Sequence, residues 1–406
     1  MNKILKGSFE LMKQLNVSAV LKVIRDNGSL SRAEIAKLTG LTPASVTNIT
    51  KILIEDKFLI ESKIGESSGG RPPIILELNP NARYVIGIGI GVGVIDVVIT
   101  NLSAQIITKK SIIIDNERYN YDLVFKKLIN LINEVLESSE LDKEKILGVG
   151  VALHGIVNAR TGESIHSLYY GWKNKNIKED LEEELELTVY VDNDVRAMAL
   201  GESWFGVTKD IANFVTLNIS NGIGAGIIIN NTPYYGVDFS AGEIGHIVVE
   251  ADGDKCNCGN YGCLETVSSN NNIIRKAIKL IKQGVSTSLS RDVEDINKLS
   301  IQDICDAAKN GDEMSITILK EAARYIGIAI TNLINILNPT AIVVVGEIFE
   351  NTTYAIETLN EIVKNRGLKL SIENVRIIRS LLGRDAAVIG AATLVIQEIF
   401  NGINRK

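Results

Sequence analysis

The feature that most constrains the fold of this chain is a cluster of metal-ligand residue types in the segment GEIGHIVVEADGDKCNCGNYGCLE, residues 242–265. The 406-residue chain has four Cys and three His, and three of the Cys and one of the His fall in this segment. Nine residues separate His246 from Cys256, one separates Cys256 from Cys258, and four separate Cys258 from Cys263. Three thiolates and one imidazole form a closed tetrahedral set that suits structural zinc.

Two other readings of the cluster are weaker. A set of free loop thiols leaves the spacing unexplained. A disulfide is disfavoured because the chain shows no secretory signal: its start, MNKILKGSFELMKQLN, lacks an apolar region and a cleavage site. No apolar run reaches transmembrane length. These observations predict a cytoplasmic protein without a membrane partner, in a compartment where thiols stay reduced.

Length and charge favour a two-part organisation. A chain of 406 residues is long for one hydrophobic core. Residues 1–80 hold 11 Lys and Arg against 8 Asp and Glu, whereas residues 81–406 hold 32 against 41. A mildly basic head on an acidic body is compatible with a head that binds nucleic acid, although a net charge of this size does not establish it.

The head has the pattern of a helix-turn-helix. After a first amphipathic helix in VSAVLKVIRDNGSL, Ser31 and Glu34 form a capping box for a second helix that ends near Gly40. Thr42 then caps a third helix, with Pro43 at its first position. The expected core of this pair is Ile35, Ala36, Leu38, Val46, Ile49, Leu53 and Ile54.

The third helix is expected to contact DNA. Its exposed side chains are polar or basic, as a helix in the major groove requires. The DNA-contacting residues predicted here are Thr42, Ser45, Thr47, Asn48 and Lys51. The stretch FLIESKIGESSGGRPPIILELN then predicts the β-hairpin wing of a winged helix, with Arg71 at a tip that can enter a minor groove. The alternatives are a helical hairpin for protein contacts and a solvated loop residue at Arg71.

The body alternates strands and helices, which predicts an α/β fold with mixed sheets. Two Gly-rich strand-turns, GIGIGVGV and GIGAGIIIN, lie far apart in the sequence and suggest two lobes around a cleft.

Together these motifs resemble the ROK family of repressors and sugar kinases, in particular its repressor branch. SRAEIAKLTGLTPASVTNIT, GESSGGRPP, VDNDVRAMALGE, GIGAGIIIN, GEIGH and CNCGNYGCLE match family motifs in order over essentially the whole chain. The resemblance implies a winged helix-turn-helix over residues 1–80 and a two-lobed, actin-like ATPase body over 81–406, with a zinc loop at about 246–263. It implies a sugar-responsive transcriptional regulator, with xylose or glucose as examples of the effector.

The resemblance also implies a sugar site next to the metal. In the family, residues that match Asn193, Asp194, Glu243, His246 and Glu265 face a sugar, and residues that match the Cys₃His set bind zinc. The metal would therefore hold the two segments that carry Glu243 and Glu265 together. Carboxylates suit sugar hydroxyls because each accepts strong hydrogen bonds. For the Asn193–Asp194 pair, helix capping is the competing interpretation.

Compared with the family's kinases, the nucleotide site looks degraded. Gly89 stands where the kinases carry an Asp, Gly93 stands at a Thr, and Glu347 replaces a Gly near the nucleotide phosphates. Phosphoryl transfer needs the phosphates and Mg²⁺ positioned and their charge offset. The chain is therefore expected not to be an enzyme.

Several points stay open at the level of sequence. The chain could be a sugar kinase with an added DNA-binding head, or a repressor controlled by a protein partner, and homodimer and homotetramer are both expected. The stretch Tyr169–Trp172 could stack on a sugar or be a packed loop. His154 stands in place of a Pro common in the kinases, which resembles xylose-type repressors. Residues 1–16 are expected to pack on the body.

Overall fold

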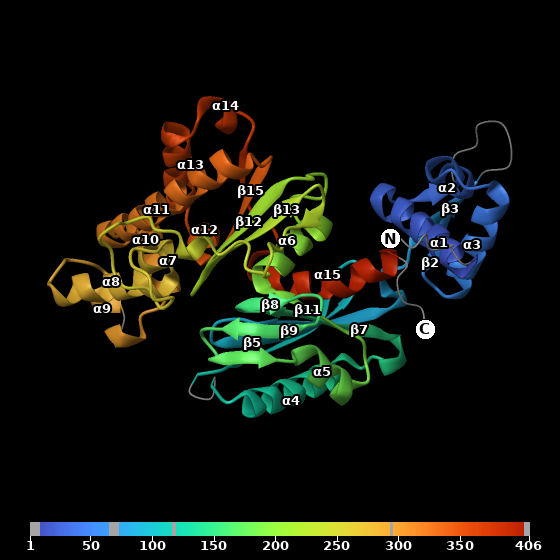
Figure 1. Cartoon of the computed structure of the whole chain (residues 1–406), viewed down its shortest axis with the longest axis horizontal. Helices are drawn as coiled ribbons and strands as arrows, with labels where there is room; N and C mark the ends of the chain where they lie inside the picture. Colours follow the sequence, from blue (N-terminus) through green and yellow to red (C-terminus); the bar gives the residue numbers. More distant parts are fainter. Residues whose placement is uncertain (1–8, 65–72, 116–118, 293–294, 402–406) are drawn as a thin grey trace.

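The protein folds into a small head and a larger body of two lobes, as the computed structural model shows (Figure 1). The structure describes residues 9–64, 73–115, 119–292 and 295–401. Within these ranges no helix is both long enough and apolar enough to cross a membrane. The predicted α/β class, with an N-terminal winged helix and a two-lobed body, is confirmed.

The head is a winged helix. Its elements are α1 (Phe9–Asn27), β1 (Leu30–Ser31), α2 (Arg32–Thr39), α3 (Pro43–Glu55), β2 (Leu59–Ile64) and β3 (Ile74–Leu78). The capping box of Ser31 and Glu34 is present, and Thr42 caps α3 through the backbone N–H of Ser45. The three strands form one antiparallel sheet in the order β1-β3-β2. The hairpin of β2 and β3 is the predicted wing, and Arg71 lies outside the described residues.

The prediction of the head core is wrong for one residue, Leu38. Ile35, Val46 and Leu53 are fully buried, but the Leu38 side chain is 52% exposed. Leu38 lies in the last turn of α2, which ends one residue later. A periodic apolar pattern identifies a helix face, but it does not say whether the terminal turn of that face is covered.

The first lobe is built on a five-stranded sheet in the order β11-β7-β4-β5-β6. Its elements are β4 (Tyr84–Ile90), β5 (Val94–Asn101), β6 (Ile106–Ile113), α4 (Tyr121–Ser139), β7 (Ile146–Leu153), β8 (Ile156–Asn158), β9 (Glu163–Ser167), β10 (Trp172–Lys175), α5 (Ile177–Leu185) and β11 (Val189–Asn193). The strands β4, β5 and β6 form an antiparallel meander, and β7 and β11 continue parallel to β4.

The second lobe repeats this topology in the order β14-β13-β12-β15-β16. Its strands are β12 (Phe214–Ile219), β13 (Ile223–Ile229), β14 (Thr232–Pro233), β15 (Ala341–Val345) and β16 (Arg376–Arg379). Its helices are α7 (Leu264–Ser268), α8 (Asn270–Lys282), α9 (Leu289–Asp292), α10 (Ile301–Lys309), α11 (Glu313–Leu337), α12 (Glu347–Asn351), α13 (Tyr354–Arg366) and α14 (Lys369–Ile372). Each lobe has its own hydrophobic core.

Two helices, α6 (Asp194–Phe205) and α15 (Ala386–Asn401), cross between the two sheets (Figure 1). They approach closely at Gly201 and Gly390, because a Cβ on Gly390 would lie 2.1 Å from the carbonyl oxygen of Ala197. Such a contact leaves no room for a larger side chain, so the close approach of the two helices requires glycine.

The head packs on the C-terminal half of α15. Val20, Leu21 and Ile24 of α1 share one buried cluster with Ala392, Ile396 and Phe400 of α15. The Ser18 hydroxyl donates a hydrogen bond to the carbonyl oxygen of Phe400. The α1 residues that belong to this cluster lie at position 17 and beyond. Within the segment expected to make it, residues 1–8 lie outside the described residues, and Met12 and Leu15 are largely exposed.

Candidate functional site

A cleft of about 450 Å³ lies between the two lobes. The first lobe contributes the β4–β5 turn, the end of β7 and the start of α6. The second contributes the β12–β13 turn, the 3-10 turn Ile244–His246 with the residues before it, and the start of α7. The five residues predicted to bind sugar all line this cleft: Asn193, Asp194, Glu243, His246 and Glu265. Residues from three separate segments, between positions 193 and 265 of the chain, are therefore brought to one place.

Asn193 ends β11 and is the N-cap of α6. Its side-chain oxygen accepts hydrogen bonds from the backbone N–H groups of Val195 and Arg196, at 3.0 and 3.1 Å. Its amide nitrogen donates to the carbonyl oxygen of Gly155 at 3.0 Å and to Oδ1 of Asp194 at 2.8 Å. Helix capping, the competing interpretation of this pair, is thus present in the structure, and it holds Asn193 and Asp194 rigidly at the cleft wall.

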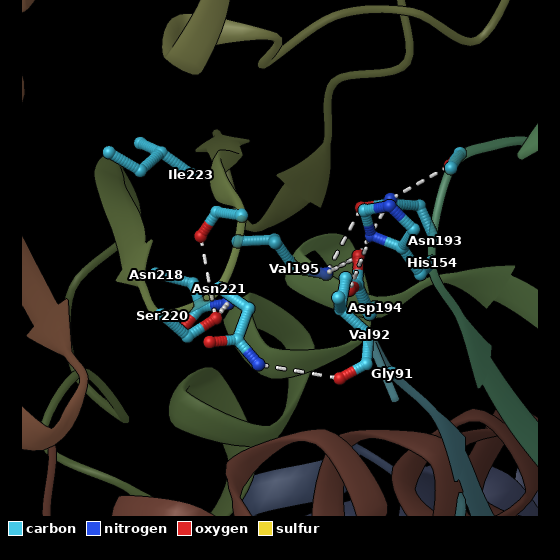
Figure 2. A network of polar contacts seen from close by, with 12 residues as sticks. Gly91, Val92, His154, Asn193, Asp194, Val195, Asn218, Ser220, Asn221 and Ile223 are labelled. Atoms are coloured by element: carbon cyan, nitrogen blue, oxygen red, sulfur yellow. Dashed lines mark hydrogen bonds and ion pairs between the residues drawn. The ribbon is translucent and has the colours of Figure 1, made fainter. Parts of the chain in front are cut away.

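Oδ1 of Asp194 accepts from Asn193, and Oδ2 of Asp194 faces His154. Nδ1 of His154 lies 3.7 Å from Oδ2 of Asp194, and Figure 2 shows the two side chains facing each other. Burial opposes a charge on this imidazole, but the hydrogen bond and charge of Asp194, with Glu265 and Glu243 nearby, raise the pKa of His154 above its ordinary value. The sequence offered the His154-for-Pro exchange as a hint of this residue, but not its partner.

Glu243 and Glu265 reach the cleft from the second lobe. Oε2 of Glu265 accepts a hydrogen bond from the backbone N–H of Ile223 at 3.2 Å, which ties it to the β12–β13 turn. Oε2 of Glu243 lies 3.8 Å from Nε2 of His246. Burial raises the pKa of Glu243, although the nearby imidazole opposes the shift. Together with Asp194, these groups place three carboxyl groups in one cleft.

The predicted metal ligands converge at the edge of the cleft. Their ligand atoms all lie within 4.8 Å of one another, and these residues are His246, Cys256, Cys258 and Cys263. Sγ of Cys258 and Sγ of Cys263 are 3.8 Å apart, and Sγ of Cys256 is 3.6 Å from Nδ1 of His246. A tetrahedral ion with zinc–sulfur bonds of about 2.3 Å sets sulfurs about 3.8 Å apart, so the four residues fit such an ion.

The surroundings of the cluster also fit a cation. Burial and the neighbouring thiols raise the pKa of Cys263 to about 12, so the three sulfurs do not ionise together without a compensating positive charge. His246 turns Nδ1 toward Cys256 and Nε2 toward Glu243, which is the arrangement that carboxylates commonly adopt behind a metal-bound His. His246 therefore belongs both to the cluster and to the lining of the cleft.

The aromatic stretch Tyr169–Trp172 is a packed loop, which was one of the two readings of the sequence. Tyr170 and Trp172 are buried, 0% and 3% exposed, within the core of the first lobe. The hydroxyl of Tyr170 donates to the carbonyl oxygen of Gly91 at 2.8 Å. The loop thus supports the β4–β5 turn from behind, and none of its side chains lines the cleft.

The part of the cleft near Gly89 carries an ion-pair network. A Cβ on Gly89 would lie 3.2 Å from Cγ1 of Val388, so even a small side chain there needs α15 to yield. Across the strand pair, Gly89 lies opposite Asp96. The Lys109 ammonium is 3.4 Å from Asp96 and 2.7 Å from Asp385. Glu347 also lines the cleft and accepts a hydrogen bond from Asn270 at 2.9 Å.

Sequence reasoning missed Arg196. Its guanidinium is 3% exposed, forms an ion pair of 2.8 Å with Asp192, and donates to the carbonyl oxygens of Phe239 and Val157 at 2.8 and 2.9 Å. It thereby ties the start of α6 to the loop that leads to Glu243. The spacing of Asp192 and Arg196, four residues across a helix start, was the available signal.

The surface of α3 presents the residues predicted to contact DNA. Thr42, Thr47, Asn48 and Lys51 are exposed and Ser45 is half-buried. Thr42 is also the N-cap of the helix: its hydroxyl oxygen accepts a hydrogen bond from the backbone N–H of Ser45 at 3.2 Å, and the two hydroxyl groups are hydrogen-bonded at 2.9 Å. Lys51 reaches Glu55 only at 3.9 Å, with 75% of its side chain exposed, so its charge is available to a phosphate.

Comparisons with known proteins agree with this architecture. Residues 85–398 match the ROK family, and residues 14–59 match a winged helix-turn-helix DNA-binding domain. The chain is 32% identical to the xylose repressor of Caldicellulosiruptor bescii over 405 residues, covering 97% of this chain and 98% of the relative. It is 33% identical to the N-acetylglucosamine repressor of Escherichia coli O6:H1 over 397 residues, covering 98% and 96%.

Solved structures give the same result. A ROK family transcriptional regulator described as a homologue of the Escherichia coli MLC protein superposes with a TM-score of 0.83 at 30% identity, covering 97% of this chain and 98% of its own. A ROK family glucokinase from Streptomyces griseus, at 24% identity, shares the fold with a TM-score of 0.70, but covers 77% of this chain and 99% of its own. From the family match and these relatives, the chain belongs to the ROK family.

Proposed function

We propose that this protein is a sugar-responsive transcriptional repressor. The observation that carries the proposal is that one chain holds both a winged helix with an exposed α3 surface and a carboxylate-lined cleft, and that the two helices that start at the cleft, α6 and α15, contact helix α1 of the winged helix. We assign DNA binding to residues 1–80 and sugar binding to 81–406. A DNA target also fits the cytoplasmic location expected from the sequence.

The effector is a monosaccharide that binds between the lobes. Asp194 comes from the first lobe, and Glu243, His246 and Glu265 come from the second, so a ligand that contacts all four holds the lobes at one closure angle. Carboxylates accept hydrogen bonds from sugar hydroxyls. Xylose and glucose are candidates, and the relatives named for xylose and for N-acetylglucosamine support this class of ligand.

Both connecting helices run from the cleft to the head. α6 begins at Asp194 in the cleft and carries Trp204 in its last turn. α15 begins at Ala386, next to the cleft-lining Ala387, and carries Phe400 in its last turn. The Arg25 side chain of α1 lies over both rings, 4.0 Å from the centre of Trp204 and 5.3 Å from that of Phe400. A change in the angle between α6 and α15 therefore moves the surface on which the head rests.

This geometry gives the route from sugar to DNA. In a dimer, two recognition helices contact successive major grooves about 34 Å apart, so a small rotation of each head spoils the match to the operator. The sugar changes DNA affinity only to the extent that it binds one closure state better than the other. A homotetramer built from two such dimers would act in the same way.

Zinc is the ion proposed for the Cys₃His cluster. The set is closed, with no ligand position left for a reacting water, so the ion stabilises the loop rather than taking part in chemistry. Val248 and Cys263 form a bridge between the segment that follows Glu243 and the one that precedes Glu265. The ion would thereby fix the spacing of these two carboxylates.

We propose that the protein does not phosphorylate its ligand. Gly89 supplies no carboxylate for Mg²⁺, and the carboxylate opposite to it, Asp96, is paired with Lys109. Glu347 and Glu350 add negative charge where nucleotide phosphates would need it offset. Sugar-dependent hydrolysis of ATP by the purified protein would support the alternative of a kinase with a DNA-binding head.

The proposal is tested by fluorescence anisotropy with DNA from upstream of the protein's own gene, at fixed salt because affinity depends strongly on it. Xylose, glucose and N-acetylglucosamine are then added in turn. One of them is expected to lower the affinity for DNA. If DNA binds and no sugar alters its affinity, control by a protein partner replaces this proposal.

A further inference from the structure

Cys258 differs from the other cysteines of the chain in its exposure. All four Cys lie within the described residues, and among them Cys258 alone is exposed. The Cys256 side chain is 4% exposed, and those of Cys263 and Cys305 are fully buried. Residues 257–261, the turn that carries Cys258, are all exposed. A small oxidant in solution therefore reaches one sulfur of the Cys₃His cluster directly.

Cys263 is the neighbouring sulfur that the fold holds in place. Its Sγ lies 3.8 Å from Sγ of Cys258. Cys263 forms a β-bridge with Val248 and is the N-cap of α7. The backbone N–H of Leu264 then donates to the carbonyl oxygen of Ile247 at 2.9 Å. These backbone contacts fix the position of Cys263 without any contribution from a metal.

Cys258 has the space to approach Cys263. A disulfide sets its sulfurs about 2.05 Å apart, so the two atoms must come closer by roughly 1.8 Å. Gly259 has a φ of 96° and no atom within 4 Å of the position of a Cβ, so the turn next to Cys258 is free to shift. Gly262 is closely packed, because a Cβ there would overlap the carbonyl oxygen of Glu250. The movement is therefore made by Cys258 toward a fixed Cys263.

We propose that Cys258 and Cys263 form an oxidisable pair, which hydrogen peroxide converts into a disulfide with release of the ion from the cluster. Ligation of a metal requires deprotonated sulfur, so the cluster holds both Cys as thiolates. A transient disulfide of this kind is compatible with a compartment in which thiols otherwise stay reduced.

The oxidation proceeds in two displacements. The Cys258 thiolate attacks one oxygen of the peroxide, which gives a sulfenic acid and a hydroxide ion. The Cys263 thiolate then attacks the sulfur of the sulfenic acid, forms the S–S bond and expels a second hydroxide ion. The two sulfurs together lose two electrons, and the peroxide gains them.

The disulfide has a consequence for the cleft. It leaves Cys256 and His246, two of the four ligands that a structural zinc ion uses. His246 lines the cleft, and its Nε2 lies 3.8 Å from Glu243. Without an ion at Nδ1, the imidazole loses the contact that fixes its orientation beside Glu243. Oxidation is therefore expected to weaken sugar binding, and this last step rests on the proposed function.

The first test maps the thiols of the full-length protein before and after treatment with hydrogen peroxide. Mass spectrometry of alkylated peptides is expected to show the loss of two thiols, those of Cys258 and Cys263, and a chromogenic chelator should detect one zinc ion per disulfide. Cys256 and Cys305 should stay reduced. Retention of all four thiols, a disulfide between other cysteines, a cross-link between two chains, or a disulfide-bonded protein that keeps its zinc would overturn the assignment.

Two variants sharpen the map. Cys258→Ser is expected to form no disulfide within the chain. Cys305→Ser, which changes a buried thiol of α10 outside the cluster, is the matched control and should oxidise as the wild type does. A Cys258→Ser protein that still loses two thiols would overturn the role of Cys258. If Cys258→Ser does not fold, the map of the wild type decides the question alone.

The second test measures sugar affinity in the reduced and the oxidised protein by isothermal titration calorimetry. The oxidised protein is expected to bind the sugar more weakly, and reduction by dithiothreitol followed by added zinc should restore the affinity. Equal affinity in the two forms would overturn the link between the oxidisable pair and the cleft. A reduced protein that binds no sugar would contradict the proposed function, while the thiol map would still decide the oxidation site.

Discussion

The guanidinium of Arg25 lies 4.0 Å from the centre of the Trp204 ring, which places a cation of the DNA-binding head on the end of a helix that begins in the cleft. The second ring under Arg25, Phe400, belongs to the other helix that begins beside the cleft. Arg25 therefore touches both helices whose relative angle would follow closure of the lobes.

Replacing Arg25 by Ala should uncouple the two sites. The variant is expected to bind both DNA and sugar. Sugar should change its DNA affinity little, whereas a coupling of roughly 5- to 150-fold is usual for such proteins. Lys13→Ala, on an exposed part of the same helix, removes the same charge and is the control. Anisotropy titrations with and without sugar measure the effect, and unchanged coupling in Arg25→Ala would exclude this contact as the route.

Lys51→Ala should weaken DNA binding at all sequences. The Lys51 ammonium is exposed on α3, and each phosphate contact adds about one unit to the slope of log affinity against log salt. The slope should therefore fall by about one in Lys51→Ala and stay unchanged in Lys13→Ala. Anisotropy at several salt concentrations distinguishes the two variants, and an unchanged slope in Lys51→Ala would remove Lys51 from the interface.

Asn48→Ala should instead lower the preference for operator over random DNA.

Cys258→Ala should lose zinc and the sugar response together. His246 of the cluster lines the cleft beside Glu243, so an open loop would release the carboxylates that bind the ligand. Cys305→Ala, in α10 and outside the cluster, is the matched control and should retain one ion per chain. Elemental analysis measures the bound zinc, and calorimetry measures the sugar affinity. Normal sugar binding in a zinc-free Cys258→Ala protein would refute the coupling.

The elements that the sequence predicted well are those fixed by neighbouring residues. The Ser31 capping box and the Thr42–Pro43 helix start depend on contacts within three residues, so the pattern alone identifies them. The convergence of His246 and the three Cys was predictable because few other structures satisfy that spacing. Leu38 was misplaced because burial of a terminal turn depends on whatever packs beside it.

Other parts depend on distant segments and left no local signal. Ser18 and Phe400 are 382 residues apart, and neither end of the chain indicates that α1 rests on the last helix. The Asp194 partner of His154 could not be found from the sequence for the same reason. Tyr169–Trp172 was ambiguous because aromatic residues both pack in cores and stack on sugars, and only the buried positions of Tyr170 and Trp172 decide between these roles.

The His154–Asp194 pair should make stability depend on pH. A histidine whose pKa is higher in the folded protein stabilises the fold below its unfolded pKa, near 6.5, and this contribution is lost as pH rises through the folded pKa. The difference in melting temperature between the wild type and His154→Gln should thus be larger at about pH 6 than at about pH 8.5. Thermal melts at both pH values measure it, and a difference that grows with pH would contradict the ion pair.

Gly390→Ala should destabilise the body. The added Cβ would lie 2.1 Å from the carbonyl oxygen of Ala197, so α6 and α15 must move apart at their crossing. Overpacking of this kind typically costs about 1–3 kcal/mol. Gly284→Ala, at a position with a positive φ but no atom within 4 Å, is a control for backbone strain alone. Denaturant unfolding measures each variant against the wild type, and a Gly390→Ala protein as stable as the wild type would show that the helices part without cost.

Coupling between the two sites is tested most directly by reciprocity between sugar binding and DNA binding. Calorimetry would measure the sugar affinity of the free protein and of its operator complex, and anisotropy would measure the DNA affinity with and without saturating sugar. Because linkage is symmetric, the two ratios should be equal, and DNA should weaken sugar binding. Equal sugar affinity in the free and DNA-bound protein would contradict this coupling, since the sugar would then have no means of releasing the operator.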